Sequence, residues 1–342
     1  MRAAVIGGSG YFGSVLLSRL ESNGYDCSNI DIIRPVQHSR AVFKNVNILD
    51  AEALEAALVG TEIVFHSAAQ VPLEKNAVSF KNVNIEGTRN VLSVVEKLGI
   101  AKTIFVSSSA VYGKPSALPV SPRCLPKPAE AYGRTKLEAE VICKQFMDHG
   151  VDVSIIRPRT ILGPGRMGIF EILFEWVFQG KMVPILGDGS NIFQFIHGDD
   201  LADACLKASE LPGPDTFNCG AQEFGTMREV LQQLIDYSGS GSRLRSLPKN
   251  LSGLGIEFFS KLGLVPLGAY HALMYGESFY FDTQYSRAKL NWNPLFSNQE
   301  MFQAAFDWYV DNRSRIRNAG ASYSHHRSPV KRGLLDIFNK FL

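Results

Sequence analysis

The sequence of 342 residues predicts an α/β fold: a doubly wound parallel sheet followed by a smaller C-terminal lobe. Short apolar segments such as IDII, EIVFHSA, KTIFVSS and DVSIIRP alternate with amphipathic helical segments through the first half of the chain. This alternation is typical of parallel strands joined by crossover helices. A chain of this length buries a large core, either in one large domain or in a main domain with a lobe.

The first expected strand, AAVI, leads directly into GGSGYFG and then into a helical segment. Its glycines follow the spacing G-x-x-G-x-x-G, which permits a tight turn and brings the backbone close to a pyrophosphate at the positive end of the helix. A strand–helix turn that binds nothing has the same pattern, so the motif gains weight from the residues that accompany it. With them, it predicts a Rossmann-type dinucleotide site formed by Gly7, Gly10, Tyr11, Phe12 and Gly13.

The second expected strand, IDII, carries an acidic residue, Asp31, eighteen residues after Gly13. A carboxylate at this place accepts hydrogen bonds from the ribose hydroxyls of adenosine. It also repels a 2′-phosphate, which favours NAD over NADP. Arg34 could pair with that phosphate instead, so NADP is the alternative cofactor.

The strand KTIFVSS ends at Ser108, which precedes Tyr132 by twenty-four residues, and Lys136 follows that tyrosine by four. On a helix, Tyr132 and Lys136 lie one turn apart and face the same side. A phenol with a pKa near 10 is a poor proton carrier at neutral pH, but an adjacent ammonium stabilises the phenolate and makes it a usable general acid/base. Ser108 could hydrogen-bond the same substrate oxygen. We therefore predict Ser108, Tyr132 and Lys136 as the catalytic residues.

These motifs, taken in order, resemble the extended short-chain dehydrogenase/reductase family, also called the NAD-dependent epimerase/dehydratase family. The resemblance covers about residues 1–310, and the segments NILD, FHSAAQ, VNIEGTRNVL and IIRPRTILGPG extend it. The family usually has an aspartate where Asn47 stands. The resemblance implies that the cofactor also contacts Asn47, Ile48, Ala68, Ala69, Gln70, Asn84, Ser107, Tyr132, Lys136, Pro158 and Ile161.

The resemblance implies redox chemistry on a secondary alcohol of a sugar, with net epimerisation through a transient ketone. The sugar would be linked to a nucleotide or to a polyprenyl diphosphate. An alternative within the family is a dehydrogenase or reductase of a 3β-hydroxysteroid, sterol or acyl alcohol. An alternative of another class is a non-catalytic NAD-sensing or scaffold protein. Dehydratases of the family typically carry Asp-Glu where Ser109 and Ala110 stand, which disfavours dehydration.

The substrate is expected to contact residues that follow the serine and the catalytic helix. Nucleotide-sugar members usually have an asparagine at the position of Thr160 and an arginine at that of Phe193, so both differences weaken a plain UDP-sugar assignment. The G-x-N spacing of Gly189 and Asn191 resembles the steroid dehydrogenases and the polyprenyl-linked sugar epimerases instead. We expect Ser109, Thr160, Asn191 and Phe193 to bind the substrate.

Three parts are expected along the chain. Residues 1–160, with returns from about 190–220, would form the dinucleotide-binding domain. Residues 161–310 would form mainly the substrate-binding lobe, and residues 311–342 a basic tail. Within the lobe, the apolar segment at residues 251–267 is either a buried hairpin or a surface for a lipid.

The composition indicates an ordinary soluble, cytoplasmic globular protein, with 45% hydrophobic and 20% charged residues. A net charge of +2, with a mildly acidic body and a basic tail, is not typical of a nucleic-acid binder. The chain enters a strand directly and has no apolar run of membrane-spanning length, which predicts neither a signal peptide nor a transmembrane helix.

No metal site is expected, because His325 and His326 have no third ligand nearby. The cysteines are expected to be reduced thiols: Cys27, Cys124, Cys143, Cys205 and Cys219.

The tail is expected to form a short helix that begins near Pro329. Its apolar residues share one stripe flanked by Lys331, Arg332 and Lys340, as in a helix lying in a lipid headgroup layer. The stripe would otherwise dock on the protein's own body or on a second copy. The tail thus predicts a peripheral contact with the inner face of the cytoplasmic membrane, and the resemblance implies a homodimer. The stripe consists of Val330, Leu334, Ile337, Phe338 and Phe341.

Overall fold

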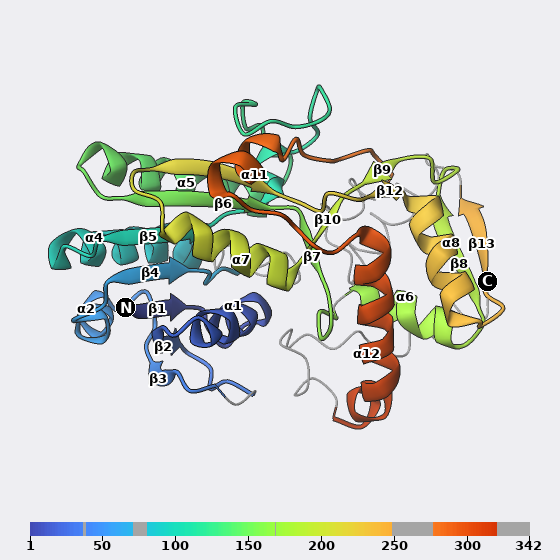
Figure 1. Cartoon of the computed structure of the whole chain (residues 1–342), viewed down its shortest axis with the longest axis horizontal. Coiled ribbons are helices and arrows are strands. Elements are labelled where there is room, and N and C mark those ends of the chain that lie inside the picture. The colour runs from blue at the N-terminus through green and yellow to red at the C-terminus, as the bar shows by residue number, and fades with distance from the viewer. Residues whose placement is uncertain (37–38, 71–80, 168, 248–275, 320–342) are drawn as a thin grey trace. The chain divides into compact units, whose positions relative to one another are not determined.

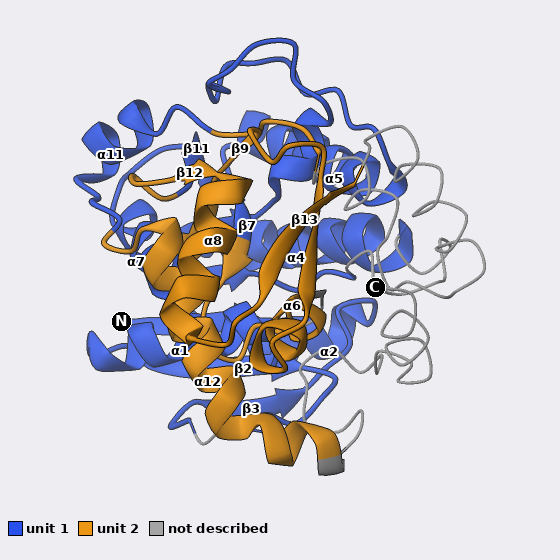
Figure 2. Cartoon of the chain, turned by 90° about the vertical axis from the view of Figure 1, so that its right-hand side faces the viewer, with its two compact units in different colours: residues 1–160, 198–220, 281–294 blue, residues 161–197, 221–280, 295–342 orange. Residues whose placement is uncertain are grey.

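The computed structural model describes the chain except for residues 37–38, 71–80, 168, 248–275 and 320–342. The chain divides into two compact units (Figure 2). Unit 1 comprises Met1–Thr160, Gly198–Gly220 and Phe281–Pro294. Unit 2 comprises Ile161–His197, Ala221–Tyr280 and Leu295–Leu342. The apolar segment at 251–267 and the tail stripe lie outside the described residues.

Unit 1 is built on a seven-stranded sheet in the order β11-β6-β5-β4-β1-β2-β3 (Figure 1). Every neighbouring pair is parallel, so the carboxyl ends of all the strands lie at one edge. The strand order reverses between β1 and β4, which is where ligands bind in open parallel sheets. The predicted doubly wound fold is confirmed. The strands are β1 (Arg2–Ile6), β2 (Asp26–Asp31), β3 (Val42–Asn45), β4 (Ile63–His66), β5 (Lys102–Val106), β6 (Val153–Pro158) and β11 (Asp215–Cys219).

Helices cover both faces of this sheet (Figure 1). One layer contains α1 (Tyr11–Ser22) and α7 (Gly198–Ser209), which pack side by side and share an ion pair between Arg19 and Asp203, 2.8 Å apart. The other layer contains α2 (Ala51–Leu58), α4 (Gly87–Leu98) and α5 (Ala131–Asp148). With both faces covered, the central strands β4, β5 and β6 are buried along their whole length. This explains why most of their residues are apolar.

Local signals set the ends of these helices. The side chain of Asp50 caps α2 by accepting a hydrogen bond from the Ala53 amide at 3.0 Å. Gly99 ends α4 in the left-handed conformation, with φ of 63°, which glycine adopts without a steric cost. A π-helix, η1 (Asn82–Glu86), leads into α4, and a short 3-10 helix, η2 (Ser109–Tyr112), follows β5.

The segment Phe281–Pro294 belongs to unit 1, although its position in the sequence placed it within the expected lobe. It contains α11 (Gln284–Leu290), which ends at Asn291 in the left-handed conformation with φ of 46°. Asparagine tolerates this conformation better than other non-glycine residues. The next residue, Trp292, is buried, and its indole donates a hydrogen bond to the Asp200 carbonyl at the start of α7 at 2.9 Å. These contacts fix the segment on the sheet unit.

The described part of unit 2 combines short strand pairs with three helices. β7 (Thr160–Leu162) pairs with β10 (Phe195–His197), β8 (Met182–Leu186) with β13 (Arg243–Leu247), and β9 (Ile192–Phe193) with β12 (Gly225–Thr226). The helices are α6 (Ile169–Phe178), α8 (Met227–Ser238) and α12 (Asn298–Ala319).

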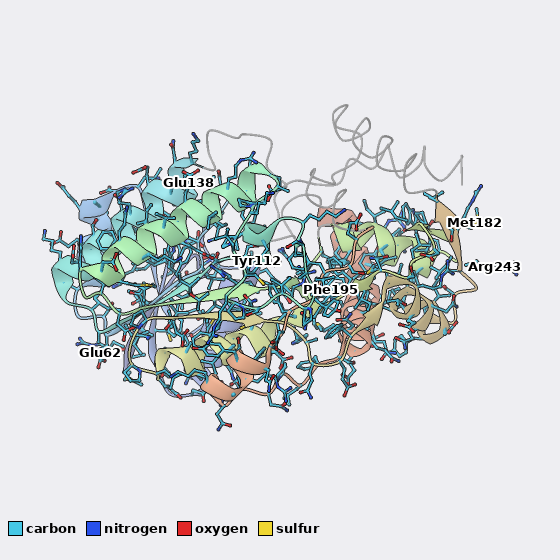
Figure 3. All side chains as sticks on the ribbon, turned by 90° about the horizontal axis from the view of Figure 1, so that it is seen from above. Glu62, Tyr112, Glu138, Met182, Phe195 and Arg243 are labelled. Carbon is cyan, nitrogen blue, oxygen red and sulfur yellow. The ribbon has the colours of Figure 1, made fainter. Side chains whose placement is uncertain are left out.

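Aromatic rings form the core of unit 2. Phe195 lies in its interior, whereas Arg243 lies on its surface (Figure 3). The Phe195 ring packs edge-on against Phe302, with centroids 5.1 Å apart, and Phe174 packs against the same ring. Such pairs add to the free energy gained by burying the rings.

Candidate functional site

The glycine turn lies at the carboxyl end of β1, against β2 and the segment after β4. Gly7 has φ of +84°, and its amide donates to the Ile30 carbonyl at 2.8 Å. A Cβ on Gly7 would stand 2.6 Å from Ala68, and one on Gly13 would stand 2.1 Å from the Gly7 carbonyl oxygen. Only glycine fits at these two places. The turn therefore has the close backbone packing that a pyrophosphate cradle requires.

Asp31 ends β2, the neighbour of β1 in the sheet. One carboxylate oxygen accepts from the Ser9 amide of the glycine turn at 3.1 Å, and the other accepts from the Ile33 amide at 3.0 Å. The carboxylate is thus held next to the turn. The guanidinium of Arg34 lies over the ring of Phe43, 5.9 Å from its centroid. Asp31 and Arg34 both bear on the choice between NAD and NADP. Asp31 is held by the glycine turn, whereas Arg34 lies over Phe43 of β3.

Ile48 and Asn47 follow β3. Ile48 is buried and its side chain lies directly against Gly87, the first residue of α4. A Cβ on Gly87 would stand 2.4 Å from that side chain. The Ile48 carbonyl accepts from the Asn90 amide group at 3.0 Å. Asn47 is exposed, and its side chain accepts from the Leu49 amide at 3.0 Å.

Asn84 joins two parts of the site from within. Its side chain is buried, and its oxygen accepts from the Gln70 amide at 2.8 Å. Its nitrogen donates to the Gln70 carbonyl at 3.2 Å and to the Thr135 hydroxyl at 3.0 Å. Since Thr135 directly precedes Lys136 on α5, this bridge fixes the segment after β4 beside that helix. The family resemblance implies a cofactor contact at Asn84, which stays a prediction, and in the structure the Asn84 side chain holds Gln70.

Helix α5, which carries Tyr132 and Lys136, begins at a cap that was not expected from the sequence. The carboxylate of Glu130 accepts from the amides of Tyr132 and Gly133, both at 2.7 Å. Acceptors at this position satisfy helix amides that have no partner within the helix. A Cβ on Gly133 would stand 2.4 Å from the Ala110 carbonyl oxygen, so the first turn of α5 lies directly against η2. Tyr132 is thereby placed beside the segment that follows Ser108.

Lys136 is buried one turn further along α5. Its ammonium donates to the Val106 carbonyl at 2.7 Å and lies over the Phe105 ring, 4.1 Å from the centroid. Burial lowers the pKa of Lys136 to about 8. Ser108 is half-buried, and its hydroxyl accepts from the Ala110 amide at 3.2 Å, which caps η2. Residues from β5, η2 and α5 thus bring Ser108, Tyr132 and Lys136 to one edge of the sheet.

The two serines beside Ser108 are buried, and each is engaged by a charged residue. Ser107 donates to Glu140 at 2.6 Å, and Ser109 accepts from the guanidinium of Arg159 at 2.9 Å. From the sequence, Ser107 is expected at the cofactor and Ser109 at the substrate. Neither Glu140 nor Arg159 is among the residues expected in the site. The spacing of Glu140, four residues after Lys136, was the available signal, because it places Glu140 on the same side of α5.

The remaining predicted site residues are spread over both units. Pro158 is buried at the end of β6, and Ala69 is half-buried after β4. Thr160, the last residue of the first segment of unit 1, and Ile161, the first of unit 2, are half-buried in β7. Asn191 and Phe193 are buried within unit 2, and Asn191 donates to the Glu277 carbonyl at 3.4 Å.

Other classes of site find no support in the described ranges. Between residues 1 and 319, apart from the omitted stretches, no group of three or more His, Cys, Asp or Glu side chains could hold a metal ion. No helix in the same part of the chain is long and apolar enough to cross a membrane. The five cysteines are free thiols, and four of them are buried. His325 and His326 lie outside the described residues.

Residues 3–220 match the NAD dependent epimerase/dehydratase family. The chain belongs to this family. Membership confirms the predicted class of enzyme, the NAD-dependent epimerases and dehydrogenases of the extended short-chain dehydrogenase/reductase type, and it confirms NAD as the cofactor. The family match includes the glycine turn, Asp31 and the Ser108, Tyr132 and Lys136 positions.

Relatives in the family differ in their reactions. A Sinorhizobium fredii protein described as uncharacterized protein y4nG is 45% identical over 337 residues, covering 98% of this chain and 85% of the relative. A UDP-glucose 4-epimerase of Mycolicibacterium smegmatis is 28% identical, covering 74% of this chain and 88% of the relative. A 3 beta-hydroxysteroid dehydrogenase/Delta 5-->4-isomerase of Mycobacterium tuberculosis is also 28% identical, covering 93% and 92%. The crystal structure of a UDP-glucose 4-epimerase from Thermotoga maritima superposes with a TM-score of 0.77 at 24% identity, covering 92% of this chain and 100% of that one, and thus shares its fold.

The carboxylate of Asp31 should set the preference for NAD over NADP. We expect Asp31→Ala to narrow the difference in Kd between the two cofactors, because the variant no longer repels a 2′-phosphate. Isothermal titration calorimetry with both cofactors measures this. Arg34→Ala is the control, and it should keep the preference because Arg34 lies over Phe43. A wild-type protein that binds NADP more tightly would contradict the assignment.

His66, another residue that the sequence analysis passed over, should make the folded protein sensitive to acid. It is buried at the end of β4, where burial and then the charge of Lys136 lower its pKa from 6.5 to about 3. Between these values the unfolded chain binds a proton that the folded chain does not, so stability falls as the pH falls below 6.5. From pH 7 to pH 5, the wild type should lose about 2 kcal/mol more than His66→Gln in urea unfolding. Equal losses would show that folded His66 accepts the proton.

Proposed function

We propose that this protein is an NAD-dependent epimerase that inverts a hydroxyl-bearing carbon of a nucleotide-linked sugar through a transient ketone. One observation carries the proposal: Lys136 is buried one turn after Tyr132, and it donates to the carbonyl of Val106, which lies two residues before Ser108. This arrangement provides a proton carrier, a cation next to it and a hydroxyl donor on one sheet edge. The likeness to the UDP-glucose 4-epimerase of M. smegmatis supports the sugar substrate.

Each of the three residues has a separate role in the proposed reaction. The phenolate of Tyr132 takes the proton of the substrate hydroxyl and later returns it. The hydroxyl of Ser108 donates to the substrate oxygen as negative charge develops there. The ammonium of Lys136 stabilises the phenolate. Because the pKa of Lys136 is about 8, the ammonium form predominates at neutral pH and is lost as the pH rises through that value.

The residues at the carboxyl edge of the sheet fit NAD. The glycine turn leaves no room for a Cβ at Gly7 and Gly13, as expected where a backbone must approach a pyrophosphate. Asp31 would hold the adenosine ribose, and Ile48 would pack against the adenine. When bound, NAD supplies the acceptor for the hydride.

A 3β-hydroxysteroid dehydrogenase is the second candidate. The steroid dehydrogenase of M. tuberculosis aligns with 93% of this chain, whereas the UDP-glucose 4-epimerase of M. smegmatis aligns with 74%. Thr160 and Phe193 also stand where nucleotide-sugar members usually have asparagine and arginine. A polyprenyl-diphosphate-linked sugar is the remaining alternative for the epimerase. Membrane contact through the tail and a homodimer stay predictions.

Two substrates separate the epimerase from the dehydrogenase. With UDP-glucose or UDP-galactose, an epimerase interconverts the sugars without net accumulation of NADH, which chromatography and absorbance measure. With a 3β-hydroxysteroid and excess NAD, a dehydrogenase accumulates NADH. Net NADH from the steroid, with no interconversion of nucleotide sugars, would overturn the proposed function in favour of the second candidate.

Tyr132→Phe should keep the fold and the affinity for NAD but lower kcat by about 10²–10⁴-fold, because the variant cannot carry the proton. Turnover of the substrate identified above measures kcat, and calorimetry with NAD measures binding. Tyr25→Phe is a suitable control, because Tyr25 precedes β2 at the amino ends of the strands. Full turnover by Tyr132→Phe would remove Tyr132 from the mechanism.

A further inference from the structure

A charged pair is buried beneath the catalytic residues. Glu140 of α5 is 0% exposed and Arg157 of β6 is 3% exposed. The guanidinium contacts both carboxylate oxygens, with Nε to Oε1 at 2.8 Å and Nη2 to Oε2 at 2.5 Å. Removing two charges from water costs about as much as their attraction returns, and an apolar pair of similar volume is often equally stable. Stability alone is therefore a weak reason for this pair.

The pair contacts both ends of the segment that contains Ser108. At the first end, the Ser107 hydroxyl donates to Glu140 Oε1 at 2.6 Å. At the other end, Arg157 Nη1 donates to the Tyr112 hydroxyl at 2.7 Å, and that hydroxyl donates to Asn218 Oδ1 at 2.9 Å. Tyr112 lies in the interior of unit 1 (Figure 3). The four residues between these contacts are Ser108, Ser109, Ala110 and Val111.

The same pair also sets the position of α5 relative to that segment. Tyr132, Lys136 and Glu140 follow one another at intervals of four residues and lie along one side of the helix. Lys136 contacts Val106, and Glu140 contacts the next residue of the chain, Ser107. Two successive turns of α5 are therefore fastened to two successive residues at the end of β5.

We propose that Glu140 and Arg157 are positioning residues that hold the hydroxyl of Ser108 in register with Tyr132. Both side chains are buried, so they would act through Ser107 and Tyr112 rather than on the substrate or cofactor themselves. This inference rests on the proposed function in so far as Ser108 acts on the substrate. A displacement of about 1 Å in a catalytic group lowers turnover by roughly 10²-fold, so such a device has a measurable effect.

The double variant Glu140→Met/Arg157→Met separates positioning from stability, because it leaves neither charge buried alone. We expect a free energy of unfolding close to that of the wild type and an unchanged Kd for NAD. We also expect kcat to fall by roughly 10²-fold, with a smaller change in KM. Hydrogen exchange measured by mass spectrometry should become faster in the peptide that covers residues 107–112.

The matched control is Lys102→Met/Asp152→Met. Lys102 is also buried, and its ammonium contacts Asp152 at 2.7 Å, but this pair lies at the amino end of the same strand, β5. The control should leave kcat and the exchange of residues 107–112 as in the wild type. Ser107→Ala, which keeps the ion pair, should lower kcat by roughly tenfold, and Ser107→Thr should restore it.

The exchange measurement needs no substrate, so it tests the positioning role even if the wild type turns over no nucleotide sugar. In that case the proposed function fails, and faster hydrogen exchange at residues 107–112 still supports the positioning role of Glu140 and Arg157. Unchanged exchange in a folded Glu140→Met/Arg157→Met variant would overturn the inference. Wild-type kcat in that variant, on any substrate that the wild type accepts, would overturn it as well.

Discussion

The hydrogen bond from the Lys136 ammonium to the Val106 carbonyl is the contact on which the site depends. It is 2.7 Å long and lies in the interior, where an ammonium without an acceptor would be very costly. The bond ties the second turn of α5 to the last residue of β5. Tyr132 lies one helical turn before Lys136. Ser108 lies two residues after Val106. This buried contact therefore helps to set the relative positions of Ser108, Tyr132 and Lys136.

The parallel sheet brings the other half of the site to the same edge. Because all seven strands run in one direction, the residues that follow β1, β2, β4 and β5 lie together although up to a hundred residues separate them. The glycine turn, Asp31 and Gln70 come from three of these ends. Hydrogen bonds from Ser9 to Asp31 and from Gln70 to Asn84 then lock neighbouring ends to one another. The fold supplies proximity, and these polar contacts supply the orientation.

Unit 1 keeps an unusual amount of charge in its interior near this edge. Lys136, Glu140, Arg157 and Arg159 are all at most 3% exposed, and burial together with the charge of Lys136 lowers the pKa of the buried His66. Charged groups are rarely buried to this degree unless they are paired or hydrogen-bonded. Here the pairing runs along α5 and across to β5 and β6. Removing these charges from water costs free energy that their attraction only about returns. The network is therefore better explained by the positions that it gives to side chains than by added stability.

The sequence by itself determined the class of fold, the glycine turn and the Tyr132 and Lys136 pair. These depend on local spacing: apolar periodicity marks strands and helices, glycines at 7, 10 and 13 mark the turn, and an interval of four residues puts two side chains on one helix face. Only the tertiary structure decided that Asn84 hydrogen-bonds to Gln70 and Thr135, and that Ser107 donates to Glu140. It also decided that the segment Phe281–Pro294 packs in unit 1. Each of these is a pairing between residues distant in the chain. Residue spacing can place Glu140 on the same side of α5 as Lys136, but it does not name the partner on another element, because the packing of the whole sheet unit selects that partner.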